Sequence, residues 1–328
     1  MCKLKSGIIL KDRIFMPDYD SHTDMLEELN IDDTRENASR LFVRAELYPK
    51  NGDVFSNIDD WEFNVDQDIL PEWFVEKYEK SRMVGAVKDW AKTHIHIGID
   101  NLTIKDGKNH YIKDCHNVNI CDSATVKNIC GSATVEYICD SATVKNICGS
   151  ATVEYICDSA TVEYICGSAT VEYICGSATV EYICDSATVK NIYGSATVEY
   201  ICDSATVEYI CDSATVKNIC DSATVEYIYG SATVEYICDS ATVKNICDSA
   251  TVEYIYGSAT VKNIYGSATV EYGKGNAIII TSKVSKWHNL TSTILLENST
   301  IKDNYGKVVY QSGDVKLIHV TNGKITEV

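Results

Sequence analysis

The chain contains the nine residues Cys121-Asp122-Ser123-Ala124-Thr125-Val126-Lys127-Asn128-Ile129, which recur with small variations through nearly half of its 328 residues. Seventeen copies follow one another without insertion or deletion. Positions three to six are Ser-Ala-Thr-Val in every copy, and position nine is Ile in every copy except the last, where it is Gly273. A fixed short period of this kind is typical of a solenoid.

The variable positions are as informative as the constant ones. Position one is Cys in thirteen copies and Tyr in four, and position two is Asp in nine and Gly in eight. Positions seven and eight change together, being Glu-Tyr in eleven copies and Lys-Asn in six.

Period-two alternation predicts how each copy folds. Ala and Val at positions four and six point to one face of a strand, while Ser and Thr at positions three and five point to the other. The Ile three places after Val must re-enter the core, so we expect a corner at positions seven and eight. Asp or Gly at position two predicts the other bend, because both residues tolerate turn conformations.

These patterns define the fold class, which is mainly β: a β-solenoid with about two nine-residue repeats per coil, a small N-terminal α/β head and capped ends. Three repeats per coil is the alternative geometry. Since stacked strands lie about 4.8 Å apart, the repeats would form a rod roughly 40 Å long. We expect an α/β head over residues 1–96, an N-terminal solenoid cap over 97–120, the repeat solenoid over 121–272, and an irregular β cap over 273–328.

The head has its own apolar pattern. Residues 41–48 and 61–65 alternate like strands, and Pro71 is expected to open a helix that runs to about Ile95. The apolar side of this helix would contain Trp73, Phe74, Tyr78, Val84, Val87 and Trp90. After it, residues 114–120 resemble a degraded repeat, as a cap over the first coil requires. The runs 293–296, 308–310 and 315–320 predict strands in the C-terminal cap.

Charge limits the classes of partner. The net charge is −18, and the repeats carry −14 of it through nine Asp, eleven Glu and six Lys. Such a surface disfavours direct binding to nucleic acid or an anionic membrane, which needs clustered Lys and Arg. The N-terminal apolar run is too short for a signal-peptide core. We therefore expect a cytoplasmic protein with mostly free thiols and no cofactor.

Three sets of repeat positions, each of which would align along the coil as a column of identical side chains, suggest ligands. Two repeats per coil would align position-one thiols in a ladder within disulfide or soft-metal range, although a small apolar packing role is the alternative. The ladder would contain Cys130, Cys148, Cys166, Cys184, Cys202, Cys220 and Cys238. The Asp column lacks the glycine-rich turn of calcium-binding nonapeptide repeats. The Ser-x-Thr rows resemble ice-binding hydroxyl arrays, but Ser and Thr are also ordinary residues of a solvated strand.

The Glu-Tyr pairs are the favoured binding residues. Tyr at position eight would stack along the coil as an aromatic ladder, or would form an acidic and aromatic strip for a protein partner. The candidate residues are Glu136, Tyr137, Asp140, Glu154, Tyr155, Asp158, Glu163, Tyr164, Glu172, Tyr173, Glu181 and Tyr182.

Catalysis is not expected. An active site needs different groups that converge at one place, whereas a repeat offers the same groups everywhere. The head contains His94 and His96 in a His-Ile-His pattern, with carboxylates such as Asp59 and Asp60. The histidines are a weak metal signal and are read as strand-edge residues. We predict no catalytic residues and no metal ligands.

The Ser-Ala-Thr-Val units joined by Cys-Asp, Cys-Gly and Tyr-Gly resemble repeat proteins of bacteriophages and of mobile elements of gut bacteria, and so do residues 11–20 and 65–74 of the head. A looser resemblance is to pentapeptide-repeat proteins, some of which imitate DNA. That resemblance implies an acidic rod that binds a protein partner, such as a basic nucleic-acid-binding protein. The alternatives are a structural spacer, a self-assembling scaffold or homo-oligomer, and an ice- or metal-binding ladder.

Overall fold

The computed structural model describes residues 4–273, 277–281, 286–287, 293–297, 300–302, 308–312, 316–321 and 324–327. The chain divides into two compact units, a head of Met1–Ile97 with Lys108–Tyr111 and a solenoid of Gly98–Gly107 with Ile112–Val328.

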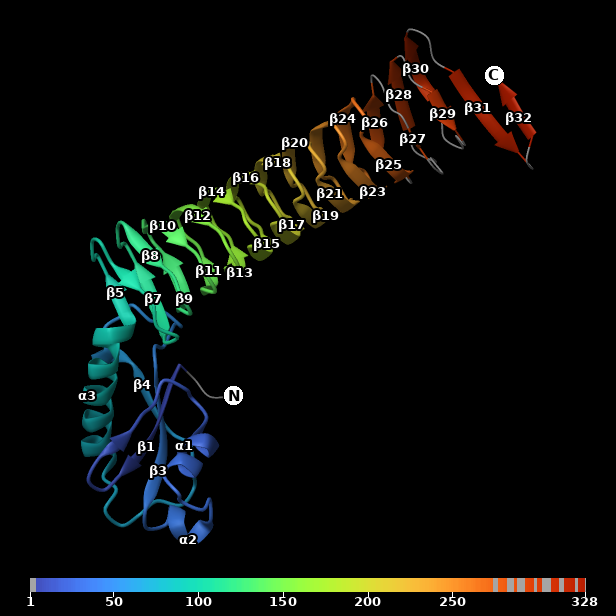
Figure 1. Cartoon of the computed structure of the whole chain (residues 1–328). Helices are drawn as coiled ribbons and strands as arrows, with labels where there is room; N and C mark the ends of the chain where they lie inside the picture. The colour runs from blue at the N-terminus through green and yellow to red at the C-terminus, as the bar shows by residue number, and fades with distance from the viewer. Residues whose placement is uncertain are drawn as a thin grey trace. The chain divides into compact units, whose positions relative to one another are not determined.

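The solenoid has two repeats per coil, which confirms the preferred geometry. Each repeat forms one strand over positions five to nine, and strands pair in parallel with those 18 residues away, as Val144 does with Val126. Alternate strands therefore enter two sheets that face each other along the rod (Figure 1). We call them the even sheet and the odd sheet after their strand numbers.

The even sheet runs in spatial order from β6 to β30. Its strands are β6 (Thr103–Ile104), β8 (Val118–Ile120), β10 (Thr134–Ile138), β12 (Thr152–Ile156), β14 (Thr170–Ile174), β16 (Thr188–Ile192), β18 (Thr206–Ile210), β20 (Thr224–Ile228), β22 (Thr242–Ile246), β24 (Thr260–Ile264), β26 (Ile278–Thr281), β28 (Thr293–Glu297) and β30 (Val308–Ser312).

The odd sheet runs in spatial order from β5 (Ile95–Ile97) through β7 (Asn109–Lys113) to β27. Its repeat strands are β9 (Thr125–Cys130), β11 (Thr143–Ile147), β13 (Thr161–Ile165), β15 (Thr179–Ile183), β17 (Thr197–Ile201), β19 (Thr215–Ile219), β21 (Thr233–Ile237), β23 (Thr251–Ile255) and β25 (Thr269–Gly273), followed by β27 (Lys286–Trp287). A separate small sheet contains β29 (Thr300–Lys302), β31 (Lys316–Thr321) and β32 (Lys324–Glu327). The three strand runs expected near the C-terminus correspond to β28, β30 and β31, although Val315 lies outside the described residues.

The core consists of the Ala, Val and Ile columns from both sheets. In the repeat that begins at Cys166, Ala169, Val171 and Ile174 are all 0% exposed, and the other copies follow the same pattern. The degraded repeat adds a further strand to the even sheet, since Val118 and Ile120 of β8 pair with Val135 and Ile138.

The turn lies at position two, as predicted. All nine Asp and all eight Gly at this position have positive φ, from 55° to 57° for Asp and from 64° to 74° for Gly. Asp tolerates this left-handed conformation better than most residues, which explains why only these two types occur there. The turn is bonded to the next coil, for example by Ser141 N–H to Asp122 O at 3.0 Å.

The corner expected at positions seven and eight is wrong. The strand continues through both positions, and the inter-coil register skips position seven, passing from Val144↔Val126 to Asn146↔Asn128. Both strands pass one residue at this point and every pair on either side of it is 18 residues apart, so the irregularity changes the alternation within each strand without shifting the register. It returns Ile147 to the core without a loop.

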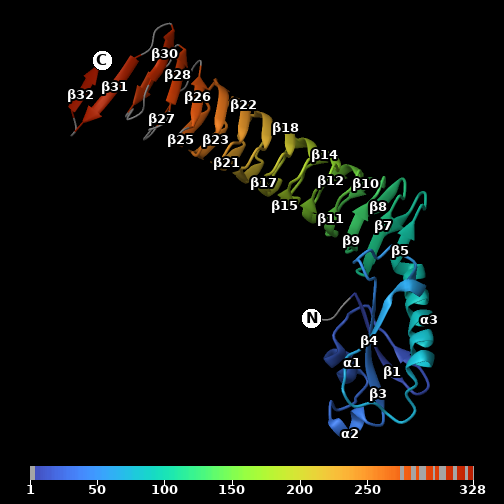
Figure 2. The same ribbon diagram turned by 180° about the vertical axis from the view of Figure 1, so that it is seen from behind.

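The head is an antiparallel sheet in the order β2-β1-β3-β4, with β1 (Lys5–Leu10), β2 (Ile14–Phe15), β3 (Phe42–Tyr48) and β4 (Glu62–Val65). The two strands expected in this region are confirmed as β3 and β4. Helices α1 (His22–Glu28) and α2 (Arg35–Ala38) cover one face, where Met25 packs with Ile8. Helix α3 (Glu76–His94) covers the other, where Met83 packs with Leu47 (Figure 2). A 3-10 turn spans Ile58–Asp60, and β5 (Ile95–Ile97) follows α3.

The helix expected to open at Pro71 begins instead at Glu76. Phe74 N–H donates to Pro71 O at 2.9 Å, so the intervening residues form a turn that precedes the helix. Trp73 and Phe74 therefore precede the helix, and they pack against Ile9, Val43 and Ala45 of the sheet. Tyr78 is 64% exposed and does not belong to the apolar side, whose buried residues are Glu79, Met83, Val87, Ala91 and His94.

Candidate functional site

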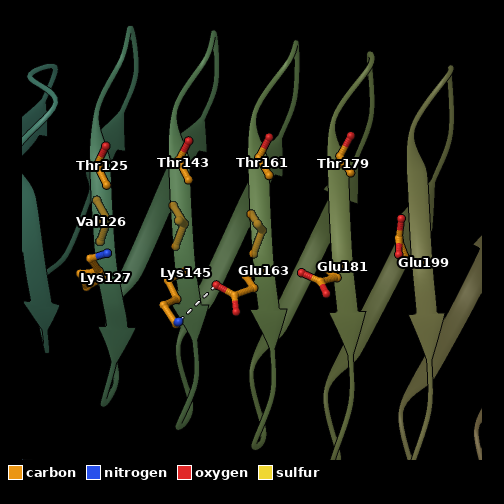
Figure 3. Close-up of a pocket in the computed structure, with 12 residues that line it drawn as sticks. Thr125, Val126, Lys127, Thr143, Lys145, Thr161, Glu163, Thr179, Glu181 and Glu199 are labelled. Atoms are coloured by element: carbon orange, nitrogen blue, oxygen red, sulfur yellow. Dashed lines mark ion pairs between the residues drawn. The ribbon is translucent and has the colours of Figure 1, made fainter. Parts of the chain in front are cut away.

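A groove of about 560 Å³ runs along the outer face of the odd sheet over β9 to β17. Because Thr at position five and Glu or Lys at position seven both point outward beside the buried Val, the two outward rows form its walls. Figure 3 shows Thr125, Thr143, Thr161 and Thr179 in one row and the charged side chains in the other. The groove therefore crosses the strands and follows the axis of the coil.

Charge is segregated along this groove. The charged wall contains Lys127 and Lys145 at one end and Glu163, Glu181 and Glu199 at the other. Lys145 Nζ pairs with Glu163 Oε2 at 3.4 Å, where the two blocks meet. Within the described residues Lys127 and Glu181 have no ion pair, so they remain available to a ligand.

The tyrosines that follow these glutamates form a regular stack. Ring centroids of Tyr164 and Tyr182 are 5.0 Å apart, and those of Tyr182 and Tyr200 are 4.9 Å apart. Parallel in-register strands place identical side chains one strand spacing apart, which explains these distances. The stack lies beyond the glutamate row and does not line the groove.

The remaining predicted Glu-Tyr residues lie on the other sheet. Glu136, Glu154 and Glu172 belong to β10, β12 and β14 of the even sheet. Their neighbours Tyr137, Tyr155 and Tyr173 stack at 5.2 and 4.9 Å. The structure thus separates the predicted strip into two chemically matched blocks on two sheets, and only the block with Glu163 and Glu181 borders the groove.

The two predicted aspartates belong to neither block. Asp140 and Asp158 occupy position two of the turns before β11 and β13. Asp140 Oδ2 accepts from Asp122 N–H at 3.0 Å, and Asp158 Oδ2 accepts from Asp140 N–H at 3.3 Å. These carboxylates therefore stabilise the stacking of the turns, a role that the sequence pattern did not reveal.

The thiol ladder is present on the even sheet from Cys130 to Cys238, and the described cysteines are all free. A hydrogen bond between the two thiols raises the pKa of Cys130 and lowers the pKa of Cys148 to about 7. Burial, reinforced by the neighbouring Asp, raises the pKa of Cys202 and Cys220 to about 12. Most of the ladder is therefore held as neutral thiol, whereas thiolate is the form that binds metal.

Two groups of three potential metal ligands occur among the described residues. One is Cys220, Cys238 and Asp239 on the ladder, and the other is His22, Glu46 and Asp66 in the head. In each group the ligand atoms lie within 4.8 Å of one another.

His94 and His96 belong to neither group, and both are buried. His96 lies in β5, an edge strand as expected, whereas His94 is the last residue of α3. Each stacks on His110, with ring centroids 5.7 and 5.2 Å apart, and His94 Nε2 lies 2.9 Å from Asp18 Oδ1. Asp59 pairs with Lys88 at 2.7 Å.

The threonine row and the two lysines at the start of the groove were missed by sequence reasoning. Thr is invariant in the repeats, so its position signalled only an outward strand face. The signal for the lysines lies in their order at 18-residue spacing, where two Lys-Asn copies precede three Glu-Tyr copies on the same sheet.

No protein-family model matches the chain, and no curated protein or solved structure matches it either. Among the described residues, no helix is both long and apolar enough to cross a membrane.

Proposed function

We propose that the protein is a noncatalytic binding scaffold whose solenoid holds an extended segment of a protein partner in the groove of the odd sheet. The observation that carries the proposal is the segregated charge of that groove, with Lys127 and Lys145 at one end and Glu163, Glu181 and Glu199 at the other. A partner segment with an acidic end and a basic end would match it.

The dimensions suit such a segment. Five strands at about 4.8 Å spacing give a groove roughly 19 Å long, which an extended chain at about 3.3 Å per residue would span with roughly six residues. Threonine hydroxyls on the opposite wall can donate to and accept from peptide groups. A row of identical hydroxyls offers no differentiated acid, base and nucleophile, which favours binding over catalysis.

Imitation of a nucleic acid has weaker support. Lys190, Lys217 and Lys244 each pair with the Glu of the preceding coil, so exposed negative charge occurs in short blocks rather than in a continuous row. A basic partner could still bind the acidic end of the groove. The resemblance to repeat proteins of bacteriophages and mobile elements supports a host protein as the partner and the cytoplasm as the place of binding.

Fluorescent peptides of about eight residues test the proposal by anisotropy. One peptide carries its acidic residues at one end and its basic residues at the other, and a second alternates the same residues. Exposed charge pairs contribute about 0.2–1 kcal/mol each, so we expect the segregated peptide to bind about fivefold more tightly.

A matched pair of variants localises the binding. Glu163→Gln, Glu181→Gln and Glu199→Gln together should abolish the preference for the segregated peptide. The same change at Glu136, Glu154 and Glu172 removes equal charge from the even sheet and should leave the preference intact. Equal binding of the two peptides to the unaltered chain, or equal effects of the two triple variants, would refute the groove as the binding site.

A further inference from the structure

The head contains a second, unrelated cluster around the first residue of α1. His22 begins that helix, Glu46 lies in β3, and Asp66 directly follows β4. His22 is 5% exposed and Glu46 is 4% exposed, whereas Asp66 is 59% exposed. One nitrogen and two carboxylate oxygens from three separate parts of the head thus lie within 4.8 Å of one another.

The hydrogen bonds of the imidazole fix its tautomer. His22 Nε2 lies 3.2 Å from Ala45 O, and a carbonyl oxygen can only accept, so Nε2 carries the hydrogen. His22 Nδ1 faces Asp66 Oδ2 at 3.4 Å. In the neutral ring, the lone pair of Nδ1 would point at a carboxylate oxygen. A positive centre, either a proton or a metal ion, therefore belongs between them.

The distance between the His22 and Asp66 ligand atoms fits a metal ion. Tetrahedral coordination at about 2.0–2.1 Å separates two ligand atoms by about 3.3–3.4 Å, which matches the Nδ1 to Oδ2 distance. A ring N–H bonded to a backbone carbonyl is also the usual outer-shell arrangement of a metal-binding histidine.

The two carboxylates are held in place as well. Asn64 Nδ2 donates to Glu46 Oε2 at 3.3 Å, and the backbone N–H of Asp66 donates to Arg44 O at 2.9 Å. The exposed side of Asp66 leaves room for water or another ligand to complete the coordination shell.

We propose that His22, Glu46 and Asp66 form a binding site for a divalent transition metal, with zinc as the ion that this nitrogen and oxygen set suits best. The site is independent of the groove, so either proposal can fail without the other.

Titration of the chelator-stripped full chain with Co²⁺ tests the site. Cobalt bound by nitrogen and oxygen shows visible d–d absorption without the thiolate-to-cobalt charge transfer that the cysteine ladder would give. We expect the wild-type chain to bind one equivalent of Co²⁺ with this spectrum, and added Zn²⁺ to displace it. His22→Gln and Glu46→Gln should each weaken Co²⁺ binding at least about tenfold. His116→Gln, which alters a histidine of the solenoid, should leave it unchanged.

Asp66→Asn changes an exposed position, where misfolding is not expected, and it too should weaken Co²⁺ binding. Unfolding temperatures of all variants without metal serve as the folding control. If no cobalt equivalent depends on Asp66 and His22, the cluster is an imidazolium–carboxylate ion pair and the proposal is overturned.

Discussion

Lys190 Nζ donates to Glu172 Oε1 at 2.6 Å across two adjacent coils of the even sheet. The same pairing joins Lys217 to Glu199 at 2.5 Å on the odd sheet. Each pair is separated by 18 residues, so the order of Lys-Asn and Glu-Tyr copies at that spacing determines which charges are neutralised. Charge order is thus a structural feature of the rod that a list of repeat types does not reveal.

Reversal of the charge at Lys190 should destabilise the rod. Lys190→Glu would place Glu at six consecutive positions of the even sheet, from Glu136 to Glu226, in place of an ion pair. We expect a lower urea midpoint at low salt and a smaller loss at high salt, because salt screens exposed charges. Lys127→Glu is the control, since it places a Glu beside Lys145 and should not lower the midpoint. A salt-independent loss in Lys190→Glu would contradict this account.

The turn at Asp203 permits a graded test of position two. Its φ is 55°, and its Oδ2 accepts from Asp185 N–H at 3.2 Å. Asp203→Ala loses this hydrogen bond and keeps a φ that is unfavourable for Ala, so the free energy of unfolding should fall by about 1–3 kcal/mol. Asp203→Gly loses only the bond and should lie between Ala and the wild type in chemical denaturation. A Gly variant less stable than the Ala variant would show that φ is not the constraint.

Substitutions at core and surface positions of one repeat should differ sharply in their effect on stability. Ile174 is fully buried, so Ile174→Ala should cost about 2–5 kcal/mol through the cavity that it leaves. Thr170 points outward in the same strand, and Thr170→Ala should change stability by no more than about 0.5 kcal/mol. Urea midpoints of the two variants give the comparison. Similar losses would mean that the inward and outward faces of the strand are misassigned.

Alkaline pH should weaken the solenoid. Burial raises the pKa of Cys157, Cys202 and Cys220 from 9.0 to about 12, so the folded state keeps protons that the unfolded state releases. Stability from these thiols is complete below about pH 9 and is lost as pH rises toward 12, because the unfolded chain then binds fewer protons. Urea midpoints should fall from pH 8.5 to 10.5.

Replacement of the three thiols provides the control for this effect. A variant with Cys157→Ala, Cys202→Ala and Cys220→Ala should show a smaller fall over the same pH range. Midpoints that do not change with pH in the unaltered chain would exclude the buried thiols as the cause.

The sequence alone predicts much of the solenoid. Strict alternation around Ala-Thr-Val and the Asp or Gly turn suffice for the two-repeat coil and for the aligned thiols of Cys130 and Cys148. The irregularity at position seven was not predictable, because it depends on pairing between coils. The start of α3 at Glu76 was missed because Pro71 also suits a turn.

The sites were less predictable than the fold. The groove depends on which repeats share a sheet, and Glu163 and Glu172 are neighbouring copies that lie on different sheets. The cluster of His22, Glu46 and Asp66 has no sequence motif, since strand pairing and the start of α1 bring the three residues together.

Binding of the charge-segregated peptide to two half-coil deletions tests the central claim most directly. Each deletion removes nine residues and moves all later repeats to the opposite sheet. Deletion of residues 148–156 changes the groove row to Lys127, Lys145, Glu172, Lys190 and Glu208, whereas deletion of 202–210 leaves it intact. We predict that both proteins fold, that the first loses the preference for the segregated peptide, and that the second keeps it. Equal binding by both folded proteins would contradict recognition through this groove and would favour a spacer.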